Sequence, residues 1–394
     1  MTTRIATSIA HGTPEVAASK IRADLFAQLE GAPPVLVVVF ASTEQPLAEV
    51  VRHLRPTLGG ALLLGASTAG EFTERGDAKG ATCAFALAGD YKVFAGMGRD
   101  LKASPAQAVQ AALRDLPREV PGYSHRTGIL LLDPLAGNGE EVTLLTAFQL
   151  GTDAPLAGGA AGDDLHMKAT HVSCGGEAAS DAMVVAQIFS KQPLGIGVCH
   201  GHSPLSAPLR VTRATGNVVE QIDGRPAWDV WLEQTREHAS ARGVDLSKMT
   251  RSEEGAYFLR YEAGVEAGSA FKVRAPLSRS DDGAISFACG VPEGTVLRIT
   301  ESEPERQVAS AREAARRARA QLGGAPAAGA LVFDCICRNL ILGAEFSTAV
   351  KGMSDELGGA PLAGFETYGE IALDAGDLSG FHNTTSVVLA FPQG

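Results

Sequence analysis

The sequence lacks the features that would place the protein in a membrane or outside the cell. It has no run of about 18 or more apolar residues, the length that a membrane-spanning helix needs. The N-terminal stretch MTTRIATSIAHGTPE has no apolar core and does not resemble a signal peptide. Six cysteines in 394 residues do not make a disulfide framework. Together these absences predict a soluble, cytoplasmic protein.

Positive charge is also scarce. The chain has 34 Lys and Arg residues against 45 Asp and Glu residues, a formal net charge of -11 at pH 7. A nucleic-acid surface needs clustered basic side chains. The most arginine-rich segment, Glu303–Leu322, interleaves its arginines with Glu305 and Glu313, a pattern typical of a solvated helix face. Neither nucleic acid nor a membrane is therefore an expected partner.

The sequence contains no recognisable enzyme motif. It has no Walker-type phosphate loop, no nucleophile-elbow serine and no paired-histidine zinc helix. Gly195-Ile196-Gly197 lacks the remaining spacing of a dinucleotide fingerprint. Cys335 and Cys337 lie at a predicted strand-to-helix junction, where a helix N-terminus favours the thiolate. A cysteine-dependent enzyme is kept as an alternative, although no histidine lies nearby in the sequence to act as its base.

Glycine, by contrast, is abundant and recurs at a fixed spacing. LLLGASTAGEF and PLAGFETYGEI each contain a glycine, a threonine three residues later, a second glycine at five and a glutamate at six. These residues are Gly65, Thr68, Gly70 and Glu71 in the first segment, and Gly364, Thr367, Gly369 and Glu370 in the second. A looser copy, PLAGGAAGDDL, contains Gly158, Gly162, Asp163 and Asp164. Because glycine permits a close backbone approach, the shared spacing predicts one backbone turn used repeatedly.

Each glycine turn ends a predicted strand–helix–strand segment. Val35–Phe40, Ile129–Leu132 and Ala330–Ile336 have the short apolar pattern of buried strands. Helices are predicted after them over 47–58, 140–149 and 340–357, and the strands entering the turns cover 61–64, 154–157 and 360–363. The predicted fold class is α/β (α+β mixed), with repeated β-α-β-turn-β units and mixed sheets flanked by helices.

Between the second and third units the pattern changes to hairpins and an aromatic helix that begins at Pro226. Two domains are therefore predicted, residues 1–205 with two units and residues 206–394 with the inserted hairpins, the helix and the third unit. Further hairpins are predicted over 81–95, turning at Gly89-Asp90, and over 285–300, turning at Pro292-Glu293-Gly294. The segment 248–271 shows no clear period and is left unassigned.

Several separated motifs, in this order, resemble the FIST family. They are GASTAGEF at Gly65–Phe72, RVTRATGNVVEQIDGRPA at Arg210–Ala227, CICRNLILG at Cys335–Gly343 and PLAGFETYGEI at Pro361–Ile371. The resemblance covers nearly the whole chain and implies a FIST N-terminal domain followed by a FIST C-terminal domain. It implies a sensory, signal-transduction module that binds a small polar ligand, such as an amino acid or a derivative, and signals to a separate protein partner.

One branch of this family resembles haem-binding nitric-oxide sensors, which need an axial histidine. The candidates are His166, His171, His200, His202 and His382. His200 and His202 are the best pair, because residues two apart on a strand face the same side. A metal held there would need further donors such as Asp163, Asp164 and His166. No cofactor is expected, and haem is kept as an alternative.

The ligand site is predicted beyond the strand ends, where glycine turns expose backbone amides. Cys335 and Arg338 follow one strand of the third unit, and Thr367, Gly369 and Glu370 follow the other. If these strands are parallel neighbours, Arg338 is suited to a ligand carboxylate and Glu370 to an ammonium group. The matching turn adds Gly65, Thr68, Gly70 and Glu71 to the predicted ligand-binding residues. The alternative is that Glu370 only caps its turn.

Overall fold

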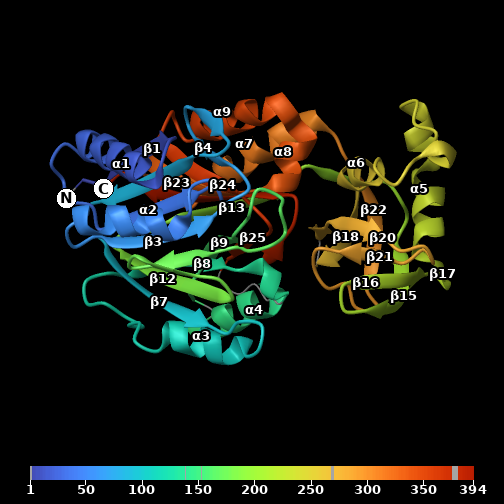
Figure 1. Ribbon diagram of the computed structural model, residues 1–394, viewed down its shortest axis with the longest axis horizontal. Coiled ribbons are helices and arrows are strands. Elements are labelled where there is room, and N and C mark those ends of the chain that lie inside the picture. The colour runs from blue at the N-terminus through green and yellow to red at the C-terminus, as the bar shows by residue number, and fades with distance from the viewer. Residues whose placement is uncertain (1, 138, 152, 268–269, 375–379) are drawn as a thin grey trace.

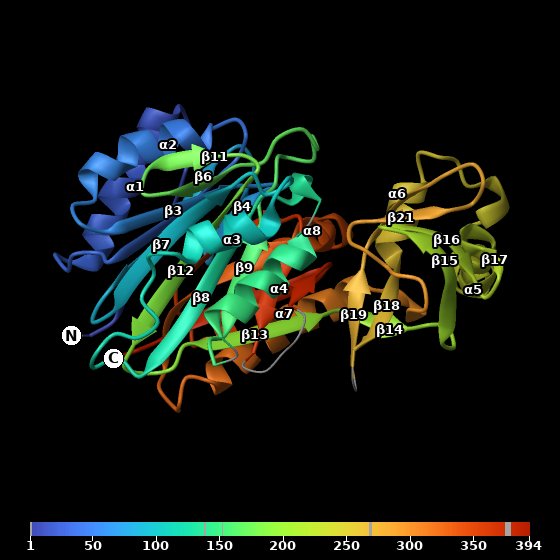
Figure 2. The ribbon, with the colours of Figure 1, turned by 90° about the horizontal axis from the view of Figure 1, so that it is seen from below.

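The computed structural model describes residues 2–137, 139–151, 153–267, 270–374 and 380–394. They form a larger body of three six-stranded sheets and a smaller lobe with a nine-stranded sheet of its own (Figure 1). The two chain ends lie near each other on the side of the body far from the lobe (Figures 1 and 2). The predicted class, mixed α/β with sheets flanked by helices, is confirmed. Within the described ranges, no helix is long and apolar enough to cross a membrane.

The first unit sets the pattern of the body. Its elements are β1 (Arg4–Ala10), α1 (Pro14–Leu29), β2 (Leu36–Ala41), α2 (Leu47–Leu54), η1 (Arg55–Thr57), β3 (Leu62–Ser67), β4 (Glu71–Thr73), β5 (Gly76–Ala78) and β6 (Thr82–Ala88). The strand order is β1-β6-β2-β3, in which only β2 and β3 are parallel. Helix α1 begins at Pro14, and the preceding Thr13 caps it by accepting a hydrogen bond from the Val16 amide.

The second and third units repeat this order. The second comprises β7 (Lys92–Arg99), α3 (Pro105–Leu113), β8 (His125–Leu132), η2 (Pro134–Ala136), α4 (Gly139–Leu150), β9 (Leu156–Ala160), β10 (Val172–Cys174), β11 (Glu177–Ala179) and β12 (Ala182–Ser190). The third comprises β13 (Gly195–His200), α7 (Pro304–Ala320), β23 (Ala327–Cys335), α8 (Ile336–Leu342), η4 (Gly343–Glu345), α9 (Phe346–Glu356), β24 (Leu362–Thr367), β25 (Glu370–Leu373), β26 (Phe381–His382) and β27 (Thr385–Pro392). Their strand orders are β7-β12-β8-β9 and β13-β27-β23-β24, again with one parallel pair each.

After its third strand, each unit donates a short hairpin to the sheet of another unit. The β4–β5 hairpin of the first unit pairs with β24, β10–β11 of the second pairs with β3, and β25–β26 of the third pairs with β9. The exchange is cyclic, so each of the three sheets of the body consists of four strands of its own unit and two donated strands. Each glycine turn therefore lies where two units meet.

The first glycine of each turn is required by a close approach of two strands. Gly65, Gly158 and Gly364 lie in the middle of β3, β9 and β24, beside the parallel neighbour, so each strand continues past the glycine at which the sequence predicted it to end. A Cβ atom on Gly158 would lie 1.9 Å from the Leu130 carbonyl oxygen, and one on Gly364 would lie 2.3 Å from the Val332 carbonyl oxygen. No other residue type fits these positions without moving the strands apart.

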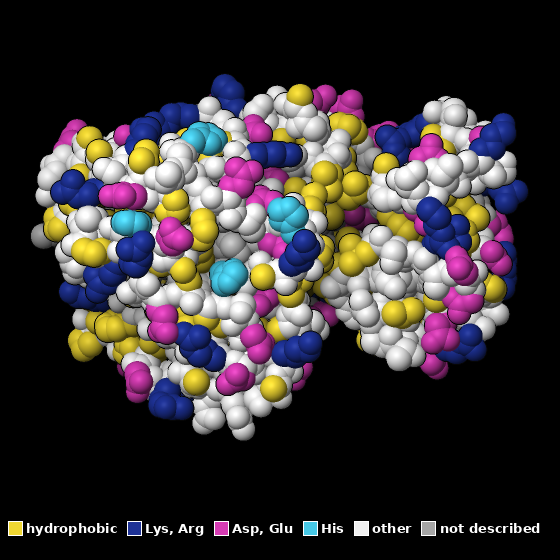
Figure 3. Space-filling model, in the orientation of Figure 1, with side chains coloured by type: hydrophobic (Ala, Val, Ile, Leu, Met, Phe, Trp, Pro, Cys, Tyr) yellow, Lys and Arg dark blue, Asp and Glu magenta, His cyan; other side chains and the backbone are white. Residues whose placement is uncertain are grey.

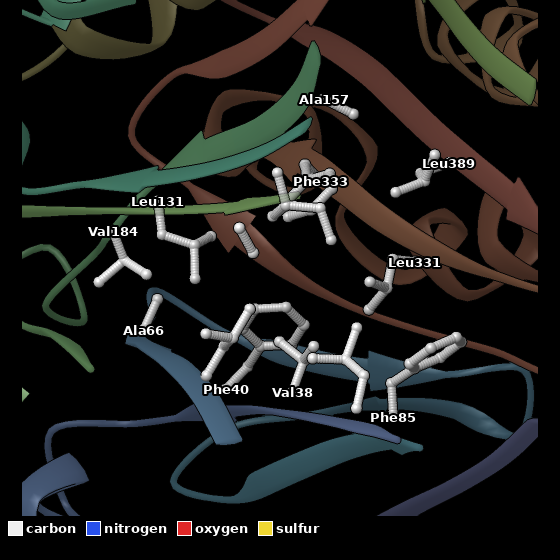
Figure 4. Close-up of a cluster of buried hydrophobic side chains, with 14 of the residues drawn as sticks. Val38, Phe40, Ala66, Phe85, Leu131, Ala157, Val184, Leu331, Phe333 and Leu389 are labelled. Atoms are coloured by element: carbon white, nitrogen blue, oxygen red, sulfur yellow. The ribbon is translucent and has the colours of Figure 1, made fainter. Parts of the chain in front are cut away.

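The inner faces of the three sheets pack against one another in the centre of the body (Figure 4). This core takes Val38, Phe40 and Phe85 from the first sheet, Leu131, Ala157 and Val184 from the second, and Leu331, Phe333 and Leu389 from the third. On β2, Val37 and Val39 point the other way, toward α1 and α2, because successive side chains of a strand alternate between faces. Strands buried on both faces explain the continuous apolar runs of the sequence.

The lobe is inserted into the third unit between β13 and α7. It comprises β14 (His202–Pro204), β15 (Leu209–Thr215), β16 (Val218–Ile222), β17 (Arg225–Pro226), α5 (Ala227–Ala241), η3 (Leu246–Lys248), α6 (Glu254–Arg260), β18 (Tyr261–Ala267), β19 (Ala270–Arg274), β20 (Pro276–Arg279), β21 (Ile285–Phe287) and β22 (Val296–Ser302). Its main strand order is β19-β18-β22-β15-β16-β21-β20. The domain boundary predicted between residues 205 and 206 lies inside this lobe, just after β14.

Two predicted hairpins are wrong. Strands β6 and β7 follow each other in the chain, but β6 lies in the first sheet and β7 pairs with β12 in the second. Similarly, β21 pairs with β16 and β20, whereas β22 pairs with β18. In both cases two strands joined by a turn take partners that are distant in the sequence. Local turn chemistry cannot reveal such partners.

The glycines of Gly195-Ile196-Gly197 allow α7 to lie directly on β13. A Cβ atom on Gly195 would lie 1.8 Å from the Ala318 carbonyl oxygen, and one on Gly197 would lie 1.8 Å from the Ala314 carbonyl oxygen. The two glycines therefore have a packing role, which is consistent with the absence of a dinucleotide fingerprint.

We expect Gly197→Ala to lower the free energy of unfolding by about 3 kcal/mol, because α7 must move away from β13 to admit the methyl group. The matched control is Gly60→Ala, where a Cβ atom meets nothing within 4 Å. That change should alter stability by about 0.5 kcal/mol or less. Urea unfolding followed by circular dichroism measures both, and equal stability of the two variants would contradict the close packing of α7.

Candidate functional site

The ends of β23 and β24 form one edge of the body, as predicted. The two strands are parallel, and Cys335 lies opposite Thr367. The lobe reaches this edge, because the Thr384 hydroxyl donates a 2.9 Å hydrogen bond to Glu262 of β18. This contact belongs to a junction cluster of buried residues, which consists of His202, Glu262, Thr300, Glu370 and Thr384. Figure 3 shows the body and the lobe in contact with each other.

Two turn glutamates are held by the same kinds of hydrogen bond. The Glu370 carboxyl group accepts one from the Thr367 hydroxyl at 2.5 Å and one from the Thr385 amide at 3.1 Å. In the first unit the matching groups are Glu71, the Thr68 hydroxyl and the Ala81 amide. Each glutamate thus ties its turn to the start of the last strand of its unit. Burial raises the pKa of Glu71 to about 8 and that of Glu370 well above its usual range.

The middle turn is closed differently, since Ala161 replaces the threonine. Asp133, which follows β8, accepts hydrogen bonds from the Thr170 hydroxyl and, at 2.6 Å, from the Asp181 amide just before β12. The same connection to the last strand is therefore made by a residue from another part of the unit. This explains why the sequence of the middle copy matches the other two only loosely.

Asp163, Asp164 and His166, the further donors considered for a metal site, lie in the loop after this turn. Asp163 accepts hydrogen bonds from the amides of residues 167–169 and, at 2.6 Å, from the Tyr368 hydroxyl. Asp164 accepts from the Thr43 amide at 2.8 Å. Among the residues that the structure describes, no group of three His, Cys, Asp or Glu side chains is placed to hold a metal ion.

The three glycine turns contact one another. The hydrogen bonds between them run from the Ser67 hydroxyl to the Gly162 carbonyl (2.7 Å), from the Ala69 amide to the Glu366 carbonyl (3.1 Å) and from the Tyr368 amide to the Ala160 carbonyl (3.1 Å). The fold therefore brings the predicted residues of the first and third units into one region. Their side chains, however, are engaged with one another, and Thr68, Glu71, Thr367 and Glu370 are all fully buried.

Glu366 is a buried acid in this region that the sequence pattern did not single out. It lies on β24, and its carboxyl group would be 2.5 Å from a Cβ atom on Gly70, which explains the second glycine of that turn. One carboxyl oxygen accepts a 2.5 Å hydrogen bond from Asn339, and the other has no partner among the described residues. Burial, together with Asp334 and Glu71, raises the pKa of Glu366 to about 9. Its position within an apolar strand gave no signal of this role.

Arg338 is completely buried and already has partners. Its guanidinium contacts the Asp334 carboxylate at 2.8 Å, and it donates further hydrogen bonds to Ser310 at 2.8 Å and to Gln307. Ser386 also donates to Asp334. The arginine therefore closes an internal ion pair that fixes α8 to α7 and β23.

Of the two candidate nucleophiles, Cys335 is poorly placed for catalysis. Cys335 is buried, and burial raises the pKa of its thiol well above the usual range, next to Cys337. A nucleophilic cysteine needs the opposite shift, toward the thiolate. A thiolate at Cys335 would also repel an ionised Glu370, because Cys335 is one of the groups that raise the pKa of that carboxyl. The geometry thus gives no support to a cysteine-dependent enzyme.

The junction cluster contains a histidine and a glutamate that face each other. The Thr300 hydroxyl donates to the Glu262 carbonyl at 2.9 Å, so it accepts from His202 Nδ1 at 3.1 Å. Burial lowers the pKa of His202 well below its usual range, which leaves Nε2 of the neutral ring without a proton. Nε2 lies 3.5 Å from Glu262 Oε2, and within the described ranges neither atom has a hydrogen-bond partner. Burial raises the pKa of Glu262 to about 8.

The other histidines of this region are occupied. His200 stacks on Phe271 with ring centroids 4.6 Å apart, and its Nε2 lies 3.2 Å from the Phe271 carbonyl oxygen. His382 contacts the Ala372 carbonyl, and burial lowers its pKa to about 3. At His202, the Glu262 carboxyl group lies next to Nε2, in the place that a haem iron would have to occupy. These residues, as arranged, do not fit an axial haem ligand.

Two family models match the chain. The FIST N domain matches residues 35–225 and the FIST C domain matches residues 231–373. The chain belongs to the FIST family. Both matches extend into the lobe, so the lobe belongs to the family fold and is not an unrelated insertion.

The relatives of this FIST protein match only part of its length. The uncharacterized protein MJ1623 of Methanocaldococcus jannaschii is 24% identical over 52% of this chain and 40% of its own. The uncharacterized proteins MT0656 and Rv0628c of Mycobacterium tuberculosis are 30% identical over 49% of this chain and 49% of their own. A crystal structure of cyanuic acid hydrolase from A. caulinodans aligns over 100% of both chains with a TM-score of 0.30 and 11% identity, too low to support any inference.

Proposed function

We propose that this protein is a sensory module that binds a small molecule carrying an ammonium group at the junction cluster and signals to a separate protein partner. FIST domains are generally sensory modules that bind small ligands. The observation that supports this site is the pair of buried atoms, His202 Nε2 and Glu262 Oε2, that have no hydrogen-bond partner among the described residues.

The chemistry of the junction cluster favours a cationic donor. A buried polar atom left without a hydrogen bond costs about 1–3 kcal/mol, so a ligand that supplies donors gains affinity there. An ammonium group has three donors and no acceptor. Glu262 and Glu370 are two acids in electrostatic contact, and His202 adds a neutral acceptor. An amine or an amino acid therefore complements this cluster better than an anion does.

Entry of the ligand requires the lobe to shift, because His202, Glu262 and Glu370 are all buried. Glu262 belongs to the lobe and Glu370 to the body, so a ligand that contacts both favours one arrangement of the two parts. A partner protein that binds only this arrangement would read out ligand occupancy. The ligand-binding roles predicted for Arg338, Cys335 and the first-unit turn stay predictions, as do the cytoplasmic location and the absence of haem.

Calorimetry with a panel of amino acids and simple amines tests the proposal. We expect at least one compound to bind the wild type, and Glu262→Gln and Glu370→Gln each to weaken it about tenfold or more, because a glutamine cannot release a proton to pair with the ammonium group as a carboxylate. Glutamine reproduces the protonated carboxyl group, so both variants should fold normally, which circular dichroism verifies. Unchanged affinity in both variants, or no binding by any amine, would refute the proposed site.

A further inference from the structure

A separate cavity of about 500 Å³ lies in the lobe. Its wall is formed by the segment that follows α5, by one side of α6 and by the start of β18. The apolar part of the wall includes Val244, Met249, Ala256 and the ring of Tyr257. A cavity of this size accommodates a small organic molecule, and such sites are typically apolar with a few placed polar groups.

The first placed polar group is the hydroxyl of Tyr261. The residue is 2% exposed and lines the cavity, yet its hydroxyl has no hydrogen-bond partner among the residues that the structure describes. Buried tyrosine hydroxyls usually find a partner, because leaving one unpaired is costly. The ring of Tyr257 contacts the ring of Tyr261, and the Tyr257 hydroxyl does have a hydrogen-bond partner, the Thr235 hydroxyl at 2.6 Å.

The second is the guanidinium of Arg260, which also lines the cavity. Within the described ranges, its nearest carboxylate oxygen belongs to Glu301, at 3.8 Å, beyond hydrogen-bond distance. Glu301 is bound more closely by Arg242, at 2.9 Å. Arg260 therefore keeps its donors available to a ligand, and guanidinium is suited to a carboxylate.

From this pairing we infer that the lobe cavity is a binding site for a small organic carboxylate with an apolar, ring-sized body. Its carboxylate is held by Arg260, the hydroxyl of Tyr261 donates to it, and its ring lies against the apolar wall. This site goes beyond the proposed function, which concerns an ammonium ligand at the junction cluster.

The two sites lie on opposite faces of the same strand. Tyr261 and Glu262 are consecutive residues of β18, so their side chains point to opposite sides of the sheet. On the neighbouring strand β22, Tyr261 pairs with Glu301, on the cavity side, and Glu262 pairs with Thr300, on the junction side. The sites are thus close in the fold but do not share side chains, and each can be tested separately.

Calorimetry with benzoate, phenylacetate and indole-3-acetate, with benzamide and benzylamine as uncharged and cationic counterparts, tests the site. We expect at least one carboxylate to bind with a Kd of about 1 mM or tighter, and benzamide and benzylamine to bind more weakly. Arg260→Gln should weaken the carboxylate about tenfold or more, and Tyr261→Phe about tenfold. Because the Tyr261 hydroxyl lacks a partner, its removal should not lower stability.

The control for charge alone is Arg236→Gln, an exposed arginine of the same lobe that does not line this cavity. It changes the net charge as Arg260→Gln does and should leave carboxylate binding unaltered. The inference is overturned if no carboxylate binds, or if binding persists unchanged in both Arg260→Gln and Tyr261→Phe. Glu262→Gln leaves the cavity intact, because Glu262 does not line it. If this variant loses amine binding but keeps carboxylate binding, the two sites are distinct.

Discussion

Arg338→Gln is expected to lower the free energy of unfolding by about 3–5 kcal/mol, the usual cost of removing one partner of a buried ion pair. The Asp334 carboxylate would then be buried without its cation, and desolvation already acts to raise its pKa. The loss is a large fraction of the ~5–15 kcal/mol that stabilises a typical domain. Urea unfolding of the purified variant measures it.

A double substitution separates the lost charge pair from lost packing. Asp334→Asn combined with Arg338→Gln removes both charges, so it should cost less than the sum of the two single substitutions. Arg316→Gln is the matched surface control, because Arg316 pairs with Glu313 while 64% exposed. It should change stability by about 1 kcal/mol or less. If Arg338→Gln lowers the free energy of unfolding no more than this control does, the buried ion pair between Arg338 and Asp334 does not stabilise the fold.

The elements with strong local patterns were predictable from the sequence. Val35–Phe40 and the segment 182–189 have only one interpretation, because short β-branched runs bounded by turns form buried strands. Proline at the first helical position and glycines after the last turn bounded α7 in the same way. The fixed spacing of Thr68 and Thr367 before their glutamates likewise corresponds to real hydrogen bonds.

What the sequence could not supply was the partner of each element. The hairpin at β4–β5 pairs with a strand nearly 300 residues later in the chain, and no local pattern specifies that choice. No pattern singled out β1 or α1 either, although Thr13 and Pro14 are regular helix-start signals. Phe148 follows the same apolar spacing on α4 as the buried Val142 and yet is 80% exposed, because the period of a helix alone does not determine which side the sheet covers.

The candidate site shows the same limit. The pattern Gly-Thr-Gly-Glu found residues that the fold brings together, but it could not distinguish a turn that binds a ligand from one that closes on itself. Glu262 and Tyr261 lie in the segment 248–271, whose sequence has no clear period and so indicates no role for either residue. Both residues are candidates because each has a buried polar atom without a hydrogen-bond partner among the described residues, the Tyr261 hydroxyl and Glu262 Oε2. Such a property exists only once the chain is folded.

Several buried glutamates keep their protons at neutral pH, Glu370 among them. Burial raises the pKa of Glu71 and of Glu262 to about 8 and that of Glu366 to about 9. In an unfolded chain each would ionise near pH ~4.3. Between the unfolded-state and the folded-state pKa, the folded protein holds protons that the unfolded chain has released. The stability that each protonated glutamate contributes is therefore complete below the unfolded-state pKa and is lost as the pH rises through the folded-state pKa.

The free energy of unfolding should therefore fall as pH rises from about 5 to about 9, by ~1.4 kcal/mol per pH unit for each such group. Glu366→Gln removes one of these titrating groups, while the glutamine oxygen can still accept the hydrogen bond from Asn339. The free energy of unfolding of this variant should therefore fall less steeply with pH, by ~1.4 kcal/mol per pH unit. Glu305→Gln, on an exposed position of α7, should run parallel to the wild type. Urea unfolding at each pH gives the slopes. A Glu366→Gln slope parallel to the wild type would mean that Glu366 is ionised in the folded protein, and that its unpartnered oxygen is stabilised by a group that has yet to be found.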